Sequence, residues 1–153
     1  MMFSESNNCW ISPPVNGWCF LFCRIDSTGK EESLLFLNRL SRFFGEACFF
    51  GTHRISSYAA WIRSVNGRIV RSFITGDSGN IVNQGERTGI ETGAAYMLID
   101  IEDEADTSKG RPQWADNEDW VMQIAGDWTV NPQDLGDEQY QTEKQLGIAG
   151  VLP

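Results

Sequence analysis

The sequence predicts a single α+β domain in which an antiparallel β-meander is flanked by two main helices. Asn66-Gly67 separates two β-rich runs, and this dipeptide is typical of a type I′ hairpin turn because both residues tolerate positive φ. Apolar residues recur at helical spacing in two segments, 31–44 and 117–128. The 153 residues, with nine Phe and six Trp, suit one folded core, so residues 1–153 are predicted to form one domain.

The first third of the chain is predicted to contain a strand followed by a helix. An irregular stretch at 12–17 leads into an apolar strand at 18–25, and the turn DSTGK ends that strand. The helix is predicted at 31–44, with two glutamates in its first turn and Gly45 as its C-terminal stop. Its apolar stripe comprises Phe36, Leu37, Leu40, Phe43 and Phe44.

The middle of the chain is predicted to form the meander. A short strand at 47–51 precedes the hairpin strands at 58–65 and 68–75, and a further strand follows at 81–84. Alternation along the hairpin gives each face a mixture of polar and apolar residues. We therefore expect helices to cover part of one face and to leave the rest in contact with solvent.

The second helix is predicted at 117–128, with Asp116 as its N-cap and two acidic residues in its first turn. Trp120 and Trp128 lie on its apolar stripe, which is a position typical of core residues. A further short helix around 138–146 and an extended end are expected to complete the chain.

Charge is distributed unevenly along the sequence. Residues 1–96 carry nine basic and eight acidic side chains, whereas residues 97–153 carry three basic and thirteen acidic ones. The net charge of −9 therefore arises in the last third of the chain. Such an asymmetry predicts an acidic field that steers a basic partner toward one side of the protein.

The stretch LIDIEDEAD at 98–106 carries five carboxylates and has three interpretations. A calcium loop of the EF-hand type does not fit, because it has glycine at its sixth position and glutamate at its twelfth, where counting from Asp100 gives Ala105 and Arg111. A strand edge at 96–101 that runs into a solvated acidic loop is the second interpretation. The third is a partner-binding face, with carboxylates at its rim and tryptophan anchors.

Few residues suit catalysis. His53 is the only histidine, so one chain cannot assemble a two-histidine metal site. Together with Arg54, it is a candidate general base for Cys48 or Ser56 as nucleophile, but no nucleophile elbow, Walker loop or dinucleotide fingerprint accompanies it. We favour a histidine ring that fills the sheet edge and bonds a backbone carbonyl, and we predict no catalytic residue, cofactor or metal.

The four cysteines are predicted to be buried, reduced thiols. Cys19 and Cys23 lie four residues apart in a predicted strand, about 13 Å along the chain, which is too far for both to bind one zinc ion. The sequence has no apolar stretch of membrane-spanning length and no pattern of a secretory leader. We therefore expect a cytoplasmic protein that does not bind a membrane.

Direct binding of nucleic acid is disfavoured. Four basic residues are interleaved with aromatic ones on the predicted hairpin and the turn before it, but the net charge of −9 implies repulsion from phosphates. We expect these arginines to pair with carboxylates of the acidic C-terminal third. They are Arg54, Arg63, Arg68 and Arg71.

Three stretches resemble an uncharacterised family of small bacterial proteins. They are PPVNGWCFLF at 13–22, FFGTHRISSYAAWIRSVNGRIVRSF at 49–73 and WVMQIAGDWTVNPQDL at 120–135. In that family a Gly-Trp strand, a hairpin with a basic second strand, and a late helix ending in a Trp-x-x-x-Pro segment recur in this order. Its members resemble immunity proteins encoded beside bacterial toxins, so the resemblance implies toxin binding. The segment 90–114 departs from the family pattern.

We therefore expect an immunity protein that neutralises a cognate, basic protein toxin by occluding its active site through an acidic surface. Trp114 is predicted to be an exposed anchor of this surface. The carboxylates predicted to bind the partner are Asp100, Glu102, Asp103, Glu104, Asp106, Asp116, Glu118 and Asp119. Two alternatives remain. One is an acidic DNA mimic that occupies a nucleic-acid-binding protein, and the other is an enzyme that uses His53 and Arg54.

Overall fold

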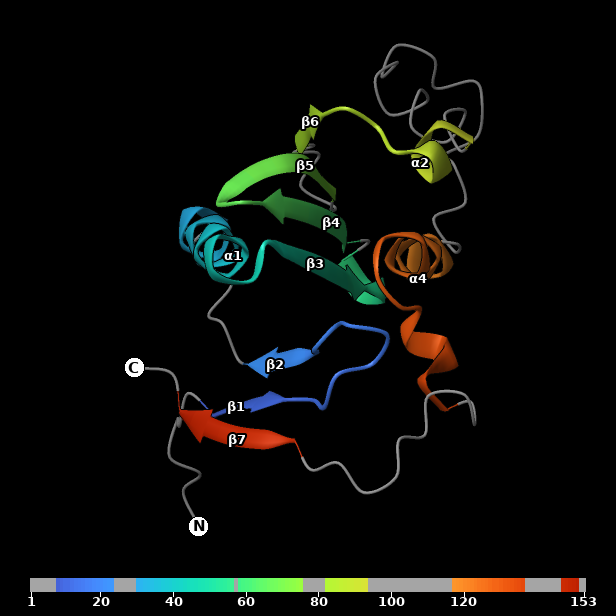
Figure 1. Cartoon of the computed structure of the whole chain (residues 1–153). Helices are drawn as coiled ribbons and strands as arrows, with labels where there is room; N and C mark the ends of the chain where they lie inside the picture. Colours follow the sequence, from blue (N-terminus) through green and yellow to red (C-terminus); the bar gives the residue numbers. More distant parts are fainter. Residues whose placement is uncertain are drawn as a thin grey trace, which may run out of the picture.

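The computed structural model is an α+β protein with two antiparallel sheets and with helices packed against the larger one (Figure 1). This confirms the predicted α+β class. No helix among the described residues is long and apolar enough to cross a membrane. The residues that the structure describes are 8–23, 30–56, 58–75, 82–93, 117–136 and 147–151.

The larger sheet is the predicted meander. Its strands pair antiparallel with their sequence neighbours in the order β3-β4-β5-β6. A short 3-10 turn, η1 (Arg54–Ser56), joins the first two strands. The strands are β3 (Glu46–His53), β4 (Tyr58–Val65), β5 (Arg68–Thr75) and β6 (Val82–Gly85).

The hairpin between β4 and β5 has the predicted turn. Asn66 has a φ of 50° and Gly67 a φ of 82°, so both central residues adopt the positive φ that a type I′ turn requires. The strand register shifts after Arg63, and Val70 is left without a partner in the ladder, which is a β-bulge. Because of this bulge, Arg63 lies directly opposite Arg71.

Two helices cover opposite faces of the meander (Figure 1). They are α1 (Lys30–Phe44) and α4 (Asn117–Trp128), as predicted. The expectation of one partly wet face is wrong, because successive residues of β4 are apolar on both sides: Trp61 packs toward α4 and Ile62 toward α1. The core on the α4 side comprises Ala59, Trp61, Phe73, Val121, Ile124 and Trp128, and that on the α1 side comprises Leu37, Ala47 and Ile62.

A buried polar junction fixes α1 to the hairpin. Ser64 Oγ donates to Asn38 Oδ1 at 2.6 Å, and Ser41 Oγ lies 2.7 Å from Ser64 Oγ. Ser41 Oγ also accepts a hydrogen bond from the amide of Gly67 at 2.8 Å. Both serine side chains are fully buried, and these bonds satisfy them. The hairpin turn is therefore held against the C-terminal end of α1.

A second sheet of three strands joins the two ends of the chain. Its order is β2-β1-β7, and both pairings are antiparallel. The expected extended end becomes its third strand, whereas the first strand and the sheet itself were not predicted. The strands are β1 (Asn8–Ile11), β2 (Leu21–Cys23) and β7 (Ile148–Val151).

The strand predicted at 18–25 begins later than expected. Asn16 and Gly17 have positive φ, and the chain folds back on itself through an isolated bridge between Val15 and Trp18. The regular strand therefore begins only at Leu21. The short helix predicted around 138–146 lies outside the described residues. Two further short elements are α2 (Gly89–Gly93) and the 3-10 turn η3 (Pro132–Gly136).

Candidate functional site

Most of the predicted partner-binding residues lie outside the part of the chain that the structure describes. The residues outside the described part are Asp100, Glu102, Asp103, Glu104, Asp106, Trp114 and Asp116. Glu118 and Asp119 are described, and both lie in the first turn of α4. Glu118 is half-buried and Asp119 is exposed, so the described part of the acidic surface is the N-terminal end of this helix.

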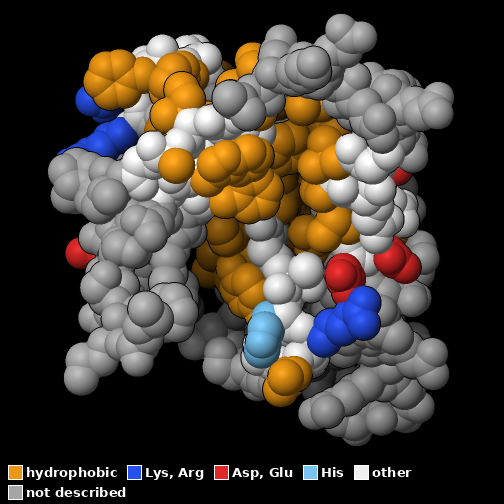
Figure 2. Space-filling view, turned by 90° about the horizontal axis from the view of Figure 1, so that it is seen from below, with side chains coloured by type: hydrophobic (Ala, Val, Ile, Leu, Met, Phe, Trp, Pro, Cys, Tyr) orange, Lys and Arg blue, Asp and Glu red, His pale blue; other side chains and the backbone are white. Residues whose placement is uncertain are grey.

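An exposed turn lies beside this end of α4. The Nε of Arg54 in η1 is 2.5 Å from Oε2 of Glu118, and the two side chains are 85% and 32% exposed. Ile55, the next residue of the turn, is 88% exposed. We call Arg54, Ile55, Glu118 and Asp119 the η1–α4 surface. It combines a large exposed apolar side chain with charged groups of both signs (Figure 2).

His53 flanks the same turn. Its Nδ1 lies 2.9 Å from Oγ of Ser56, and both residues are accessible to solvent. The predicted ring that fills the sheet edge and bonds a backbone carbonyl is wrong, because the ring is exposed and bonds a hydroxyl. One of the two predicted nucleophiles is therefore beside His53, and the bond also closes the short turn.

Cys48, the other predicted nucleophile, does not meet His53. His53 lies five positions after Cys48 in β3, which is about 16 Å along an extended strand. Burial, together with the nearby Glu46 carboxylate, raises the pKa of the Cys48 thiol from 9.0 to about 12. The thiol is therefore protonated at neutral pH and is a poor nucleophile.

The two tryptophans of α4 belong to the core. Trp128 is buried, and its ring centroid lies 5.8 Å from that of Phe50 on β3. Trp120 packs against the same cluster from a partly buried position. The guanidinium of Arg63 lies 5.9 Å from the Trp128 ring centroid, within the range of a cation–π contact. Packing of these rings fixes α4, and with it the acidic first turn, against the sheet.

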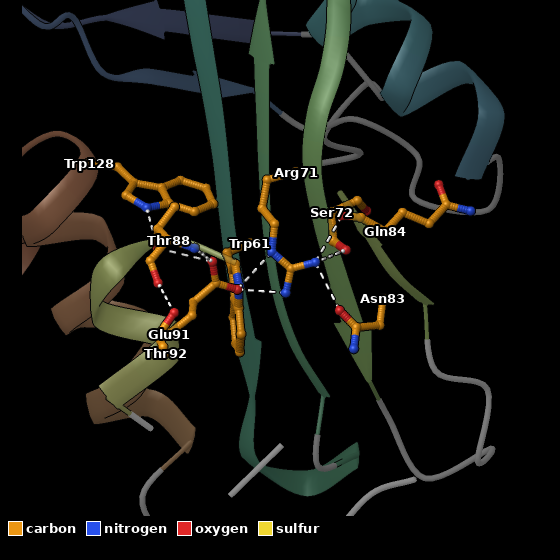
Figure 3. A network of polar contacts seen from close by, with 9 residues as sticks. All are labelled: Trp61, Arg71, Ser72, Asn83, Gln84, Thr88, Glu91, Thr92 and Trp128. Carbon is orange, nitrogen blue, oxygen red and sulfur yellow. Dashed lines mark hydrogen bonds and ion pairs between the residues drawn. The ribbon is translucent and has the colours of Figure 1, made fainter. Parts of the chain in front are cut away.

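A buried network with Glu91 at its centre joins β4, β5 and α2 (Figure 3). Glu91 Oε1 accepts hydrogen bonds from Trp61 Nε1 at 2.7 Å and from Arg71 Nε at 2.8 Å. Arg71 Nη2 forms an ion pair with the same oxygen at 2.6 Å. Glu91 Oε2 accepts from the backbone amide of Thr88 at 2.9 Å and from its hydroxyl at 3.0 Å. Burial raises the pKa of Glu91, but these hydrogen bonds outweigh it, so the pKa is lowered and the carboxylate stays ionised.

Arg71 carries the network on to β6. Its Nη1 donates to Asn83 Oδ1 at 2.9 Å and to the backbone oxygens of Gln84 and Ser72 at 2.8 and 3.0 Å. The side chains of Arg71 and Glu91 are 2% and 0% exposed, so this is a fully buried ion pair. Charged groups at such positions are tolerated only when their hydrogen-bonding atoms find partners, and most of them do here.

The network fixes the place where the chain leaves the described core. Glu91 accepts from the backbone amide of Thr88 at the start of α2, which is one of the two bonds of a capping box, and Trp128 Nε1 on α4 donates to Thr88 Oγ1 at 3.3 Å. The chain leaves α2 at Gly93 and enters α4 at Asn117. Both ends of the segment that contains the predicted acidic residues are therefore anchored to neighbouring elements.

Sequence reasoning missed this network, although a local signal was present. Thr88-x-x-Glu91 is the spacing of a capping box, but the surrounding glycines were interpreted only as turns. No local pattern indicates that Arg71 on β5 reaches Glu91 on α2. That contact follows from the bulge and from the packing of α2.

The predicted pairing of the arginines is partly wrong. Among the described residues, only Arg54 pairs with the acidic C-terminal third, while two others pair with glutamates of the first 96 residues. The ion pairs are Arg54–Glu118, Arg63–Glu46 and Arg71–Glu91. Since the bulge places Arg63 opposite Arg71, a separate glutamate for each arginine removes their mutual repulsion. Arg68 is exposed and forms no ion pair with the described residues.

The cysteines differ from the prediction as well. Cys19 is exposed, and Cys9 and Cys48 are only partly buried. All three are free thiols. Within the described ranges, no group of three or more His, Cys, Asp or Glu side chains is arranged to hold a metal ion.

Comparisons with models of protein families, with curated proteins and with solved structures found no match to this chain. The resemblance to immunity-associated proteins therefore stays a prediction from the sequence.

Proposed function

We propose that this protein is an immunity protein, which binds a basic protein toxin of bacteria and neutralises it by occluding the toxin's active site through an acidic surface. The observation that carries the proposal is the 88% exposed Ile55, which follows Arg54 in η1. Arg54 pairs with Glu118 in the first turn of α4, where the segment 94–116 with its six carboxylates ends. The proposed location is the cytoplasm.

The η1–α4 surface has the composition of a protein-binding site. Burying an isoleucine side chain in a partner contributes about 1.5–3 kcal/mol, so Ile55 suits the apolar centre of an interface. Charged groups around such a centre increase the association rate and the selectivity more than the affinity. An acidic rim therefore favours encounter with a basic partner.

The distribution of charge along the chain also supports a basic protein partner. Residues 97–153 carry a net charge of −10, and α2 and α4, which bracket the acidic stretch, lie beside each other. A concentration of negative charge in one part of the chain attracts basic proteins over distances of about one Debye length, roughly 8 Å at physiological salt. A DNA mimic also uses negative charge, but an exposed apolar anchor is a feature of protein recognition rather than of a phosphate-like surface.

The experiment is a pull-down with the tagged full chain from lysate of the source cells, at low and at high salt, with mass spectrometry of the retained proteins. Glu118→Lys/Asp119→Lys tests the charges. Its control is Glu31→Lys/Glu32→Lys, which makes the same change in the first turn of α1. Ile55→Asp tests the apolar anchor, and Ile148→Asp on β7 is the control at another exposed isoleucine.

We expect one basic protein in stoichiometric amount, released at high salt, retained by both control variants and lost with both test variants. Retention of a nucleic-acid-binding protein that DNA displaces would instead favour the DNA mimic. The proposal is wrong if every protein that the wild type retains is also retained by the two variants of the η1–α4 surface.

A further inference from the structure

The outer face of α1 carries an exposed cluster of arginine and phenylalanine side chains, which the proposed function does not use. Leu35, Arg39, Arg42 and Phe43 recur at intervals that place them on one face of the helix, and all four are exposed. Phe43 is 82% exposed and Phe44 is 80% exposed. Figure 2 shows basic side chains next to exposed apolar ones on the side of the molecule where Figure 1 places α1.

The hairpin adds a third arginine to this cluster. Gly67 lies so close to α1 that a Cβ on it would be 3.0 Å from Nε of Arg42. The amide of Gly67 is also bonded to Ser41, so the next residue, Arg68, begins β5 beside the end of the helix. We call Leu35, Arg39, Arg42, Phe43 and Arg68 the α1 patch.

The arginines of the α1 patch differ from the other arginines discussed above. Arg54, Arg63 and Arg71 each pair with a glutamate, whereas Arg39, Arg42 and Arg68 form no ion pair with any residue in the described ranges. The buried junction of Ser41 with Ser64 holds the helix end rigidly beneath them. The patch is thus a fixed, positively charged and partly aromatic surface on a protein whose net charge is −9.

We propose that the α1 patch binds a segment of a partner protein that carries carboxylates and at least one apolar side chain. Carboxylates match the guanidinium groups, which form no ion pair within the described ranges and which bind carboxylates in a bidentate geometry. An apolar side chain of the partner covers the exposed side chains of Leu35 and Phe43. This is a second surface, separate from the η1–α4 surface, and it selects a partner of opposite charge.

Charge favours a protein segment over an extended polyanion. A membrane of anionic lipids or a nucleic acid extends far beyond the patch and meets the charge of −10 carried by residues 97–153. A short acidic segment touches the patch alone, and the described carboxylates of α4 lie on the opposite face of the meander from α1, where salt weakens their effect.

The test measures binding of a fluorescein-labelled synthetic peptide of glutamate and leucine residues to the full chain by fluorescence anisotropy. A peptide with lysine in place of glutamate serves as the probe of opposite charge. Two variants alter the patch: Arg39→Gln/Arg42→Gln removes charge, and Leu35→Ser/Phe43→Ser removes the exposed apolar side chains. Gln123→Glu/Gln133→Glu is the control for the first, because it changes two exposed residues elsewhere and shifts the net charge from −9 by the same amount.

We expect the acidic peptide to bind and the lysine peptide not to bind. Each patch variant weakens binding about fivefold or more, because it removes two groups that contact the peptide, whereas the control variant changes binding less than about twofold. The proposal is overturned if the acidic peptide does not bind, or if the control weakens binding as much as Arg39→Gln/Arg42→Gln does. If the acidic peptide does not bind, two results would show another occupant of the patch in place of the proposed one. They are binding of the protein to vesicles of anionic lipid, and a dimer of the protein that Arg39→Gln/Arg42→Gln dissociates.

Discussion

Replacing Glu91 by glutamine isolates the contribution of the buried ion pair. The substitution keeps the size of the side chain, but it leaves the guanidinium of Arg71, 2% exposed, without an opposite charge at the 2.6 Å contact. Removing one partner of a buried pair typically costs about 3–5 kcal/mol, because the remaining charge stays buried. We expect Glu91→Gln to lower the free energy of unfolding by about 3 kcal/mol, which corresponds to roughly 6–12 °C in Tm for a chain of this length.

The measurement is urea unfolding followed by tryptophan fluorescence and by circular dichroism. Arg54→Gln is the matched control, because it removes one partner of an exposed ion pair and is expected to cost less than about 1 kcal/mol. The double variant Glu91→Gln/Arg71→Gln should be destabilised by less than the sum of its two single variants, since both charges are gone. The reasoning is refuted if Glu91→Gln costs no more than Arg54→Gln.

Three further predictions concern pH, thiol chemistry and backbone geometry. Because the pKa of folded Glu91 is lowered below its ordinary value of 4.5, its ionised form stabilises the fold above that pH, and this stability is lost as the pH falls through the lowered pKa. The free energy of unfolding should therefore fall less steeply with acid pH in Glu91→Gln than in the wild type, and equal slopes contradict the assignment. Cys48, whose pKa is raised to about 12, should resist iodoacetamide at pH 8 in the folded protein, whereas the exposed Cys19 should react. Peptide mass spectrometry measures the alkylation of each thiol, and equal rates for the two argue against this prediction. Gly85→Ala should lower the free energy of unfolding by about 2 kcal/mol or more, because a Cβ there lies 2.0 Å from a backbone oxygen at a φ of 84°. Gly89→Ala places its Cβ in open space and should lower it by less than about 1 kcal/mol, and similar thermal midpoints for the two variants rule this prediction out.

The elements that the sequence predicts well are those with local signals. The Asn66-Gly67 turn requires positive φ at two successive residues, and few dipeptides permit this. The two long helices have apolar stripes and acidic first turns, and their observed bounds agree with the predicted ones. Local chemistry alone determines these features.

Features that depend on distant parts of the chain were missed. The pairing of β1 with β7 joins the two ends of the sequence, and neither four-residue strand has a periodic pattern long enough to detect. The burial of both faces of β4 depends on the position of the second helix. The ion pair of Arg71 with Glu91 depends on a bulge and on a helix of five residues.

The candidate site was predicted only in part. The acidic first turn of α4 follows from the helix pattern, and Glu118 and Asp119 are both in it. The exposure of Ile55 could not be predicted, because an isoleucine before a β-strand is normally interpreted as a core residue. Its exposure becomes visible only in the structure, where η1 connects the end of β3 to the start of β4.

The central claim, neutralisation by an acidic surface, is tested most directly by titrating the activity of the captured partner with the purified protein. The account predicts complete loss of activity at one equivalent of wild-type protein, an equal effect of Glu31→Lys/Glu32→Lys, and little effect of Glu118→Lys/Asp119→Lys. Inhibition by Glu118→Lys/Asp119→Lys that equals that of the wild type would contradict the account.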